Sequence, residues 1–575
     1  MTKKLINEPS NCVQELIEGL LATTTGLKRV EGFNVVVRSD IKSVVEANKV
    51  TIVSGGGSGH EPAHAGYIGQ GMLSAVALGN VFASPSVATV LAAIRCVASP
   101  AGVLVIVKNY TGDRLNFGMA IEQARGEGIN ARMLVVEDDC ALEPGKGITG
   151  GRGVCGTVLV HKIAGASAER GLSLDEVHDR ASRAASSMGT MGVALSPCFV
   201  PGASVSDAAS QRLTGRTVEV GMGIHGEPGR ETMELPEKDA ADALTDIMID
   251  AIIGKEDGAG ARVAIKRGDK AVVMINNLGA TPVLELFIVA RRVANVLKSR
   301  GIVLARAFVG SFMTSLEMGG VSVTILRSTD ADQLSLFDAA TLAPAWVPST
   351  KLDVETVDQV IPYTSSAGPA KTVTGGGSIP GASTALAAIC NKLIELEPKL
   401  TEYDTICGDG DCGIVMKAGA TGVLRDLETH AKNEADAALF CSGVADSLSD
   451  SMGGTSGALL ELALRAMSAH FAKNGGSDWG SAVGVGVEAM QFYGGATAGM
   501  RTMLDALIPA SKALSAKLDL KAVAEAARKG ADSTKTMASL AGRSNYIDSA
   551  KMDGVPDPGA IAIAAAFTAL TEAQQ

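Results

Sequence analysis

The sequence predicts two domains of different class, an α/β domain followed by a separate domain made of helices alone. Short runs of β-branched residues alternate with helical patterns from residue 30 to about 330. Proline, glycine and serine interrupt this periodicity from about 340 to 378, and beyond it strand patterns almost vanish. A chain of 575 residues is also too long for one hydrophobic core. We therefore expect an α/β domain at 1–340, a linker at 341–378 and an all-α domain at 379–575.

The elements of the first domain follow from short runs rich in valine and isoleucine, which are typical of buried strands. Seven strands are expected, at Val35–Val37, Val50–Val53, Val103–Val107, Met133–Val136, Ala271–Ile275, Ile302–Leu304 and Val321–Leu326. Helical periodicity between several of them predicts helices at Ser86–Val97, Leu115–Arg125 and Val283–Leu297.

The second domain is expected to be all-α because its apolar residues recur with helical spacing. The pattern predicts helices at 381–397, 413–428, 433–450, 456–472, 478–493, 501–516, 520–539 and 558–572. One of them carries a stripe typical of a buried helix face, formed by Leu460, Leu464, Met467 and Phe471. An acidic stretch at 404–411 falls in the first loop between these helices.

Charge and cysteine content exclude several classes of protein. A net charge of −11 has the wrong sign for a general binder of nucleic acid or of anionic membranes, so any phosphate site must be local. The nine cysteines form no C-x-x-C pair, which argues against zinc or redox motifs and favours a reduced, cytoplasmic setting. The sequence shows neither the apolar segment of a signal peptide nor a run long enough for a membrane span.

The acidic stretch is a candidate metal site. Asp404, Asp409 and Asp411 fall within eight residues, and the glycines among them allow the backbone to fold tightly. Carboxylate oxygens suit Mg²⁺ or Mn²⁺, although acidic, glycine-rich turns without metal are common. An EF-hand is excluded because Ile414 stands at the position of its obligatory glycine and Ala420 at that of its glutamate.

A phosphate-binding site is expected at Ser451–Gly457, which leads directly into a predicted helix. Free amides at a helix N-terminus bind anions, although an ordinary glycine-rich N-cap would look the same. Arg543 in a loop and the turn Pro556–Ala560 before the last helix support the phosphate interpretation. No P-loop is present, and a G-x-G-x-x-G string at 151–156 lacks the strand that should precede it.

Polar residues that could bind an acceptor follow two predicted strands of the first domain. One strand leads into the loop Ser54–Pro62, which contains His60, and another is followed by Lys108 and Asp113. His225 lies in a third glycine-rich loop. Each loop histidine could be structural, but together these side chains could perform acid–base chemistry on a hydroxylated carbonyl compound. The other histidines fall in helical patterns, and His64 is expected in the helix after the first loop.

Five longer motifs follow one another along almost the whole chain. They are Gly-Gly-Gly-Ser-Gly-His-Glu-Pro at 55–62, Lys-Asn-Tyr-Thr-Gly-Asp-Arg-Leu-Asn-Phe-Gly at 108–118, Gly-Met-Gly-Ile-His-Gly-Glu at 221–227, Gly-Asp-Gly-Asp-Cys-Gly at 408–413 and Asp-Pro-Gly-Ala at 557–560. With these motifs the chain resembles the ATP-dependent dihydroxyacetone (glycerone) kinases of the fused, two-domain type, which include the animal triokinase/FMN cyclases.

For the first domain the resemblance implies a pocket for dihydroxyacetone. His225 would add an imidazole nitrogen to the ketone carbonyl and hold the substrate as a hemiaminal, which excludes glycerol because glycerol has no carbonyl. Asp113 would act as general base on the hydroxyl that attacks the γ-phosphate, and His60 would hydrogen-bond the substrate. The other residues implied in the pocket are Gly57, Ser58, Gly59 and Lys108.

For the second domain the resemblance implies a helical barrel that binds Mg-ATP, with Asp404, Asp409 and Asp411 as Mg²⁺ ligands. The nucleotide-binding residues implied are Gly410, Asp411, Cys412, Gly413, Thr455, Ser456, Gly494, Thr502, Met503, Arg543, Asp557, Pro558 and Gly559. Arg543 would stabilise the charge of the transferred phosphoryl group. Two positions depart from the wider family: Met500 replaces an aspartate, and Cys412 replaces the histidine of some members.

Two other functions remain open from the sequence. One is a Mn²⁺-dependent lyase that splits FAD into AMP and cyclic FMN, and the other is a non-enzymatic sensor of carbonyl ligands. The resemblance implies a triose, either dihydroxyacetone or D-glyceraldehyde, and ATP as ligands, a role in glycerol metabolism, and a homodimer with exchanged domains. Neither nucleic acid nor a membrane is expected as a partner.

Overall fold

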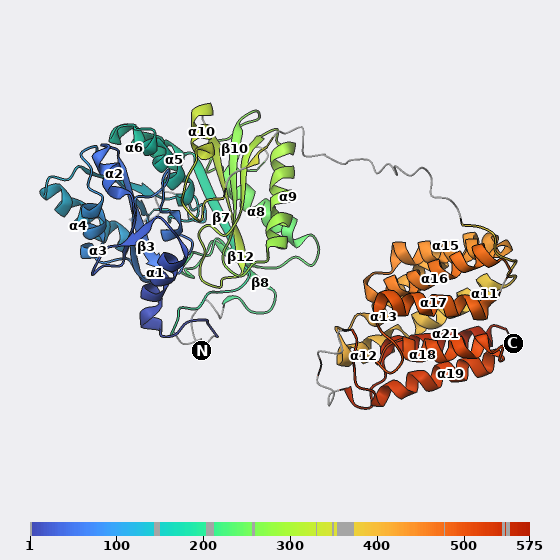
Figure 1. Cartoon of the computed structure of the whole chain (residues 1–575). Coiled ribbons are helices and arrows are strands. Elements are labelled where there is room, and N and C mark those ends of the chain that lie inside the picture. The colour runs from blue at the N-terminus through green and yellow to red at the C-terminus, as the bar shows by residue number, and fades with distance from the viewer. Residues whose placement is uncertain are drawn as a thin grey trace. The chain divides into compact units, whose positions relative to one another are not determined.

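A computed structural model describes residues 3–142, 150–202, 212–255, 259–328, 330–347, 350–352, 373–476, 478–542, 547 and 552–574 (Figure 1). The chain divides into two compact units, Met1–Ile361 and Pro362–Gln575. The first unit contains two β-sheets with helices, and the second contains only helices among its described residues. The predicted order of fold classes is therefore confirmed. Within the described residues, none of the helices combines the length and the apolar character that a membrane crossing requires.

The first sheet of the N-terminal unit is mainly parallel and has the strand order β1-β2-β4-β3-β5-β6. Its strands are β1 (Leu27–Arg29), β2 (Val35–Arg38), β3 (Thr51–Ser58), β4 (Ala75–Val81), β5 (Val103–Lys108) and β6 (Ala131–Val136). One face packs against α3 (Val87–Cys96) and α4 (Thr111–Gly126). The other face packs against α1 (Cys12–Thr23), α5 (Thr157–Glu169) and α6 (Leu174–Ser186). The short helix α2 (Ile41–Glu46) precedes β3.

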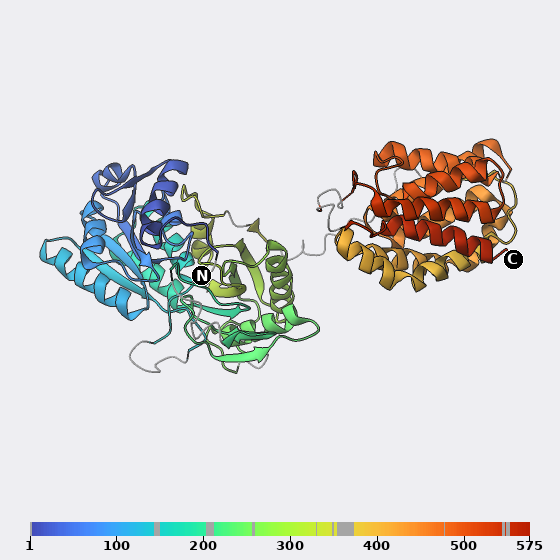
Figure 2. The same cartoon turned by 90° about the horizontal axis from the view of Figure 1, so that it is seen from below.

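The second sheet is mainly antiparallel, and among its described strands only β10 and β11 run parallel. In its spatial order it contains β13 (Thr350–Lys351), β11 (Val303–Gly310), β10 (Lys270–Asn277), β12 (Gly320–Ser328), β7 (Met188–Ala194), β8 (Thr217–Val220) and β9 (Glu231–Glu234). Helices α8 (Ala240–Ile253) and α9 (Val283–Ser299) cover one face, and α10 (Ala331–Asp338) lies nearer to α5. Figure 2 shows these layers from below.

Helix α5 lies between the two sheets and is buried along almost its whole length. One continuous apolar core joins it to Ile52 and Ile106 of the first sheet and to Met274 of the second. Because this helix is enclosed on all sides, its sequence lacks the polar face of a surface helix. The core therefore fixes the two sheets relative to each other, so that loops from both can contribute to one site.

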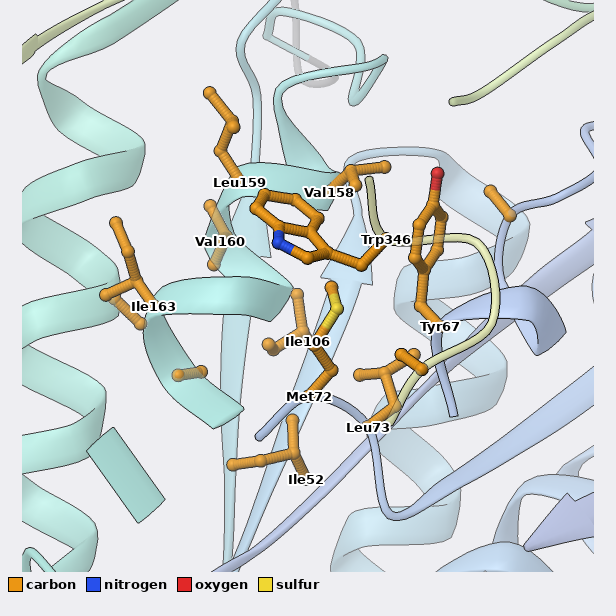
Figure 3. Packing of buried hydrophobic residues seen from close by; sticks show 14 of the residues in the cluster. Ile52, Tyr67, Met72, Leu73, Ile106, Val158, Leu159, Val160, Ile163 and Trp346 are labelled. Carbon is orange, nitrogen blue, oxygen red and sulfur yellow. The ribbon is translucent and has the colours of Figure 1, made fainter. Parts of the chain in front are cut away.

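The N-terminal unit continues beyond residue 340, where the sequence predicted a linker. Trp346 is buried, its ring lies 4.8 Å from that of Phe308, and Figure 3 shows it among Met72 and Val158. Strand β13 then pairs with β11. The first compact unit extends to Ile361, and the domain limit expected at 340 stays a prediction. The sequence pattern did not reveal this packing, because one aromatic residue among prolines shows neither helical nor strand periodicity. Residues 353–372 of the predicted linker lie outside the described residues.

The C-terminal unit consists of α11 (Ala382–Glu395), α12 (Glu397–Cys407), α13 (Cys412–Arg425), α14 (Leu427–Lys432), α15 (Ala437–Ser451), α16 (Gly454–Asn474), α17 (Trp479–Gly494), α18 (Leu504–Ser515), α19 (Leu520–Ser533) and α21 (Pro558–Glu572). Residues from α11, α13, α15, α16, α17, α18 and α21 surround an apolar interior cavity of about 290 Å³. The predicted stripe from Leu460 to Phe471 belongs to this interior. The helices thus form the walls of a barrel.

Helix α12 was not predicted, and it changes the position of the first acidic residue. Asp404 lies inside α12 and not in a loop, whereas Asp409 lies in the loop after it and Asp411 is the N-cap of α13. The sequence pattern ended the preceding helix near Pro398. In the structure this proline occupies the first turn of α12, where its missing N–H is not needed.

Candidate active site

The glycine-rich stretch after the second predicted strand, Val50–Val53, is itself part of a strand. The sequence placed a loop from Ser54 onward, but β3 continues to Ser58. A side chain at Gly55 would collide with the carbonyl of Ala77, and a Cβ at Gly57 would lie 2.6 Å from the amide nitrogen of Ala83. The glycines therefore allow β3 to pack closely against its neighbours, and the chain leaves the sheet only at Gly59.

The structure brings the two loop histidines together. His60 follows β3, His225 follows β8, and their Nε2 atoms are 3.1 Å apart. The Nδ1 atom of His60 donates to the carbonyl oxygen of Thr314 at 2.8 Å. The Nδ1 atom of His225 donates to the carboxylate of Glu227 at 2.7 Å. Because both Nδ1 atoms are donors, neither Nε2 atom carries a proton when the rings are neutral, and their lone pairs face each other.

Burial and charge set the protonation states around this pair. Burial, assisted by the positive charge of Lys108, lowers the pKa of His60 well below its usual value. Burial alone would raise the pKa of Glu227, but its hydrogen bond to His225 and the charge of that imidazole lower it to about 2. Burial also lowers the pKa of Lys108. Near neutral pH a neutral His60 therefore faces the Nε2 atom of His225, and an ionised Glu227 accepts from its Nδ1 atom.

Lys108 and Asp113 lie on the same side of the site. Lys108 ends β5, and Asp113 is in the first turn of α4, so the strand-to-helix connection places both at the carboxyl edge of the sheet. A Cβ at Gly56 would lie 3.4 Å from Cε of Lys108 and 3.6 Å from Oδ2 of Asp113. The absent side chain of Gly56 thus leaves the space beside this cation and this carboxylate open. Both residues are buried.

Several residues around the site were not assigned a role from the sequence. The hydroxyl of Ser84 donates to Asp113. Phe82 stacks on the His60 ring at 5.0 Å, and Tyr110 meets the His225 ring edge-on at 4.8 Å. Glu227 could have been inferred from its position two residues after His225. No local signal marks Ser84 or Phe82, because their contacts join distant parts of the chain.

The other histidines lie away from this pair or at its periphery. His64 was expected in a helix, but it precedes the three-residue 3₁₀ helix Ala65–Tyr67. It is buried and lies 3.0 Å from the Nε2 atom of His161 in α5. His430 is also buried, whereas His470 carries hydrogen bonds at the surface of α16. None of these side chains contacts His225 among the interactions of the described residues.

In the C-terminal unit the three acidic residues converge. Oxygen atoms of Asp404, Asp409 and Asp411 all lie within 4.8 Å of one another. Asp404 is held in place because its Oδ2 accepts hydrogen bonds from the amides of Asp411 and Cys412, at 2.8 and 2.9 Å. Three converging carboxylates fit a hard divalent cation, and a site with so few protein ligands leaves positions for water and phosphate oxygens.

A cavity of about 260 Å³ adjoins these carboxylates. Its walls include nearly all the nucleotide-binding residues expected from the sequence: Asp411, Cys412, Thr455, Ser456, Gly494, Thr502, Met503, Asp557, Pro558 and Gly559. The first turn of α16 has no side-chain cap, so its amides are free to bind an anion. Burial raises the pKa of Asp557, the N-cap of α21, to about 7.

Two expected residues, Gly410 and Gly413, do not line this cavity. Gly413 lies in the first turn of α13, where a side chain would collide with the carbonyl of Glu397, so its glycine serves helix packing. Gly410 has a φ of +79°, which suits the turn of the acidic loop. Arg543 lies outside the residues that the structure describes.

Arg501 lines the cavity, although no role was predicted for it from the sequence. Its guanidinium is buried and donates to the carbonyls of Thr534 and Val555 at 3.2 and 2.8 Å, and to the sulfur of Cys407 at 3.1 Å. It therefore links the end of α12, just before Asp409, to the segment that leads into α21. In the neighbouring loop, Asp505 accepts hydrogen bonds from the amides of Gly499 and Thr502, and the sulfur of Met500 accepts one from the amide of Thr497.

Comparison with known proteins gives matches along the whole chain. A Dak1 domain is matched at residues 18–345 and a DAK2 domain at residues 406–572. A putative 3,4-dihydroxy-2-butanone kinase of Solanum lycopersicum is 43% identical over 99% of this chain and 97% of its own. The human triokinase/FMN cyclase is 42% identical, and the alignment covers 100% of both chains.

A solved structure shows the same fold. The dihydroxyacetone kinase of C. freundii in its native form has a TM-score of 0.69 and 35% sequence identity, with 100% of both chains covered. The same values hold for its complex with AMP-PNP and Mg²⁺.

Proposed function

Because this chain belongs to the family of proteins that join a Dak1 domain to a DAK2 domain, we propose that it is an ATP-dependent dihydroxyacetone kinase. The reaction transfers the γ-phosphate of ATP to a hydroxyl of dihydroxyacetone and gives dihydroxyacetone phosphate. Relatives that carry kinase names and extend over the full chain support this assignment, as does the fold shared with the C. freundii kinase.

The observation that carries the proposal is the orientation of His225. Its Nδ1–H donates to an ionised carboxylate, so the nucleophilic lone pair belongs to Nε2. That atom faces His60 within a buried, aromatic-walled site beside Lys108 and Asp113. A neutral imidazole nitrogen with a fixed direction is suited to add to a carbonyl carbon.

The covalent step needs no additional reactant. The Nε2 lone pair of His225 forms a bond to the carbonyl carbon, and the C=O π bond breaks toward oxygen. The oxygen takes a proton from Nε2 of His60, which carries it only for this step and is left neutral, in line with its lowered pKa. Glu227 stabilises the positive charge that remains on the substituted imidazole. Glycerol is excluded because it offers no carbonyl carbon.

The phosphoryl acceptor is then the free hydroxyl of the bound triose. Asp113 is the general base for that hydroxyl, and Ser84 fixes the orientation of its carboxylate. Mg²⁺ held by Asp404, Asp409 and Asp411 supplies positive charge to the phosphate oxygens of ATP. Thr455 and Ser456, at the uncapped start of α16, donate to the phosphates, and Asp557 to Gly559 form the nucleotide wall.

Replacement of His225 tests the proposal directly. In His225→Ala we expect loss of the hemiaminal signal of [2-¹³C]dihydroxyacetone in ¹³C NMR, together with loss of turnover in a coupled kinase assay. Binding of AMP-PNP and Mg²⁺, measured by calorimetry, should remain because those ligands use the other unit. An unchanged affinity for dihydroxyacetone in this variant would remove the hemiaminal from the mechanism.

A lyase that forms cyclic FMN from FAD is the alternative suggested by the triokinase/FMN cyclase relatives. Such a reaction would use the acidic site of the helical unit with Mn²⁺ and would not need His225. The complete set of carbonyl-binding residues in the first unit therefore favours the kinase. Parallel incubations with FAD and Mn²⁺, and with dihydroxyacetone, ATP and Mg²⁺, distinguish the two, and a protein without turnover in either would favour the carbonyl sensor.

We extend the proposal to the cellular context. The enzyme acts in the cytoplasm, in glycerol metabolism, uses Mg²⁺ and accepts D-glyceraldehyde as a second triose. It works as a homodimer in which helical units are exchanged between partners. Light scattering coupled to size exclusion gives the mass of the assembly, and a mixture of His225→Ala and Asp404→Asn chains tests the exchange. Activity from that mixture, when neither variant is active alone, would support it.

A further inference from the structure

The G-x-G-x-x-G string at 151–156 has no part in the mechanism above. It lies between β6 and α5, and its glycines serve close packing. A Cβ at Gly153 would lie 2.6 Å from the carbonyl oxygen of Val136 and 2.8 Å from Cα of Lys108. A Cβ at Gly156 would lie 2.5 Å from Oδ2 of Asp138. The segment therefore packs closely against the end of β5, where the residues proposed to bind the substrate begin.

The one charged residue of this segment, Arg152, is buried and paired. Its Nε donates to Oδ2 of Asp139 at 2.6 Å, and both side chains are largely shielded from solvent. The other carboxylate oxygen of Asp139 accepts from the amide of Ala141 at 2.8 Å. An ion pair in this environment is costly to form and strongly destabilising to break on one side only. Arg152 therefore has a fixed position.

The rest of the guanidinium holds the loop that carries His225. Nη2 donates to the carbonyl of Gly221 at 2.7 Å, and Nη1 contacts the carbonyl of Pro228 at 3.4 Å. These two carbonyls lie on either side of His225 in the sequence. Between them, a side chain at Gly223 would collide with Glu227, and its Cβ would lie 2.5 Å from Nη1 of Arg152. The loop thus wraps around the guanidinium.

We propose that the Arg152–Asp139 pair is a positioning element for catalysis, which sets the direction of the His225 Nε2 lone pair by holding both ends of the loop at 221–228. This inference rests on the proposed function, since it assigns the pair a part in hemiaminal formation. The pair acts through the loop and does not touch the substrate. Arginine is required because one planar guanidinium reaches the carboxylate and two carbonyls at once, whereas the ammonium of lysine is a point donor.

Arg152→Lys is the test variant. Lysine keeps the positive charge opposite Asp139, but it cannot also donate hydrogen bonds to the carbonyls of Gly221 and Pro228. Misplacement of a reacting group by about 1 Å costs on the order of 100-fold in rate. We therefore expect kcat/KM for dihydroxyacetone to fall about 100-fold and the ¹³C hemiaminal signal to weaken, while calorimetric binding of AMP-PNP with Mg²⁺ is unchanged. Asp139→Asn, which frees the guanidinium to move, should give a smaller loss of the same kind.

Arg306→Lys is the matched control. Arg306 also forms a partly buried pair with an aspartate, Asp338, and also donates to a backbone carbonyl, that of Ala305. It lies in β11 and its partners lie outside the loop of His225. We expect a comparable fall in melting temperature in this control without loss of the hemiaminal signal.

The outcomes separate the inference from the function on which it rests. If the unaltered protein shows no hemiaminal signal, the proposed covalent mechanism fails. If it shows the signal, and Arg152→Lys and Asp139→Asn keep both the signal and kcat/KM, the positioning role is refuted. Equal losses in Arg152→Lys and Arg306→Lys would also refute it, because they would reflect stability alone. If Arg152→Lys does not fold, Asp139→Asn decides by the same two measurements.

Discussion

The hydrogen bond between Glu227 and His225 is the contact on which the nucleophile depends, and Glu227→Gln tests it. The carboxylate accepts from Nδ1 at 2.7 Å and from the backbone amide of His225 at 2.9 Å, so it fixes both the ring and its tautomer. Glutamine keeps the shape but removes the charge. A hydrogen bond to a charged group contributes roughly 1.5–3 kcal/mol, against about 1 kcal/mol for a neutral one.

The expected loss is therefore about 1–2 kcal/mol, which corresponds to about a 5- to 30-fold lower population of the hemiaminal. The partial exposure of Glu227 places the effect toward the lower end of this range. The assay combines titration of the ¹³C signal with kcat/KM for dihydroxyacetone, and Glu231→Gln, an exposed residue of β9, serves as the control. An unchanged hemiaminal population in Glu227→Gln would show that this carboxylate does not orient the nucleophile.

Three further predictions follow from the contacts described. The folded state lowers the pKa of Glu227 from its ordinary value of 4.5 to about 2. The stability that this ionised group adds is therefore complete above pH 4.5 and is lost as the pH falls through about 2. Urea titrations across this range should show a weaker pH dependence of stability in Glu227→Gln. Asp404→Asn should weaken Mg²⁺-dependent binding of AMP-PNP in calorimetry at least about 10-fold, because a charged ligand that also holds two amides is lost, whereas unaltered binding would contradict the metal site. Trp346→Ala should destabilise the N-terminal unit by about 3–5 kcal/mol in chemical denaturation, and an effect below about 1 kcal/mol would place this residue outside the core.

The fold could be predicted where side chains carry a periodic signal. Runs of valine and isoleucine identified β2, β5, β6, β10 and β12. Strands β4 and β7 were missed because glycine, alanine and methionine fill them, although both are largely buried. Their stability comes from neighbouring strands on both sides, which a sequence pattern does not contain. Helix α12 was missed because a proline that begins a helix was taken as the end of one.

The site could be predicted only as far as loops at strand ends can be recognised. His60, Lys108 and Asp113 were predicted in this way, and the structure places His60 against His225 and Lys108 beside Asp113. Ser84 was not found, because its contact with Asp113 joins residues 29 positions apart. The same limit applies to Arg501, whose partners come from three separate segments. Side chains that position other side chains leave no local pattern, so they are the part of a site that requires a structure.

The two units meet the demands of their ligands in opposite ways. In the first, three polar groups at the centre already have partners: His60 with Thr314, His225 with Glu227, and Asp113 with Ser84. A small neutral triose offers few contacts, so selectivity for it must come from groups that are fixed before it binds. In the second, the first turn of α16 is uncapped, and Asp409 and Asp411 are exposed. ATP and its cation are both charged, so exposed amide donors and carboxylates are sufficient to bind them. The same exposure allows the product nucleotide to leave. Rigidity is therefore required in the carbonyl site, and we expect substitutions that loosen it to lower turnover more than substitutions of similar size around the nucleotide.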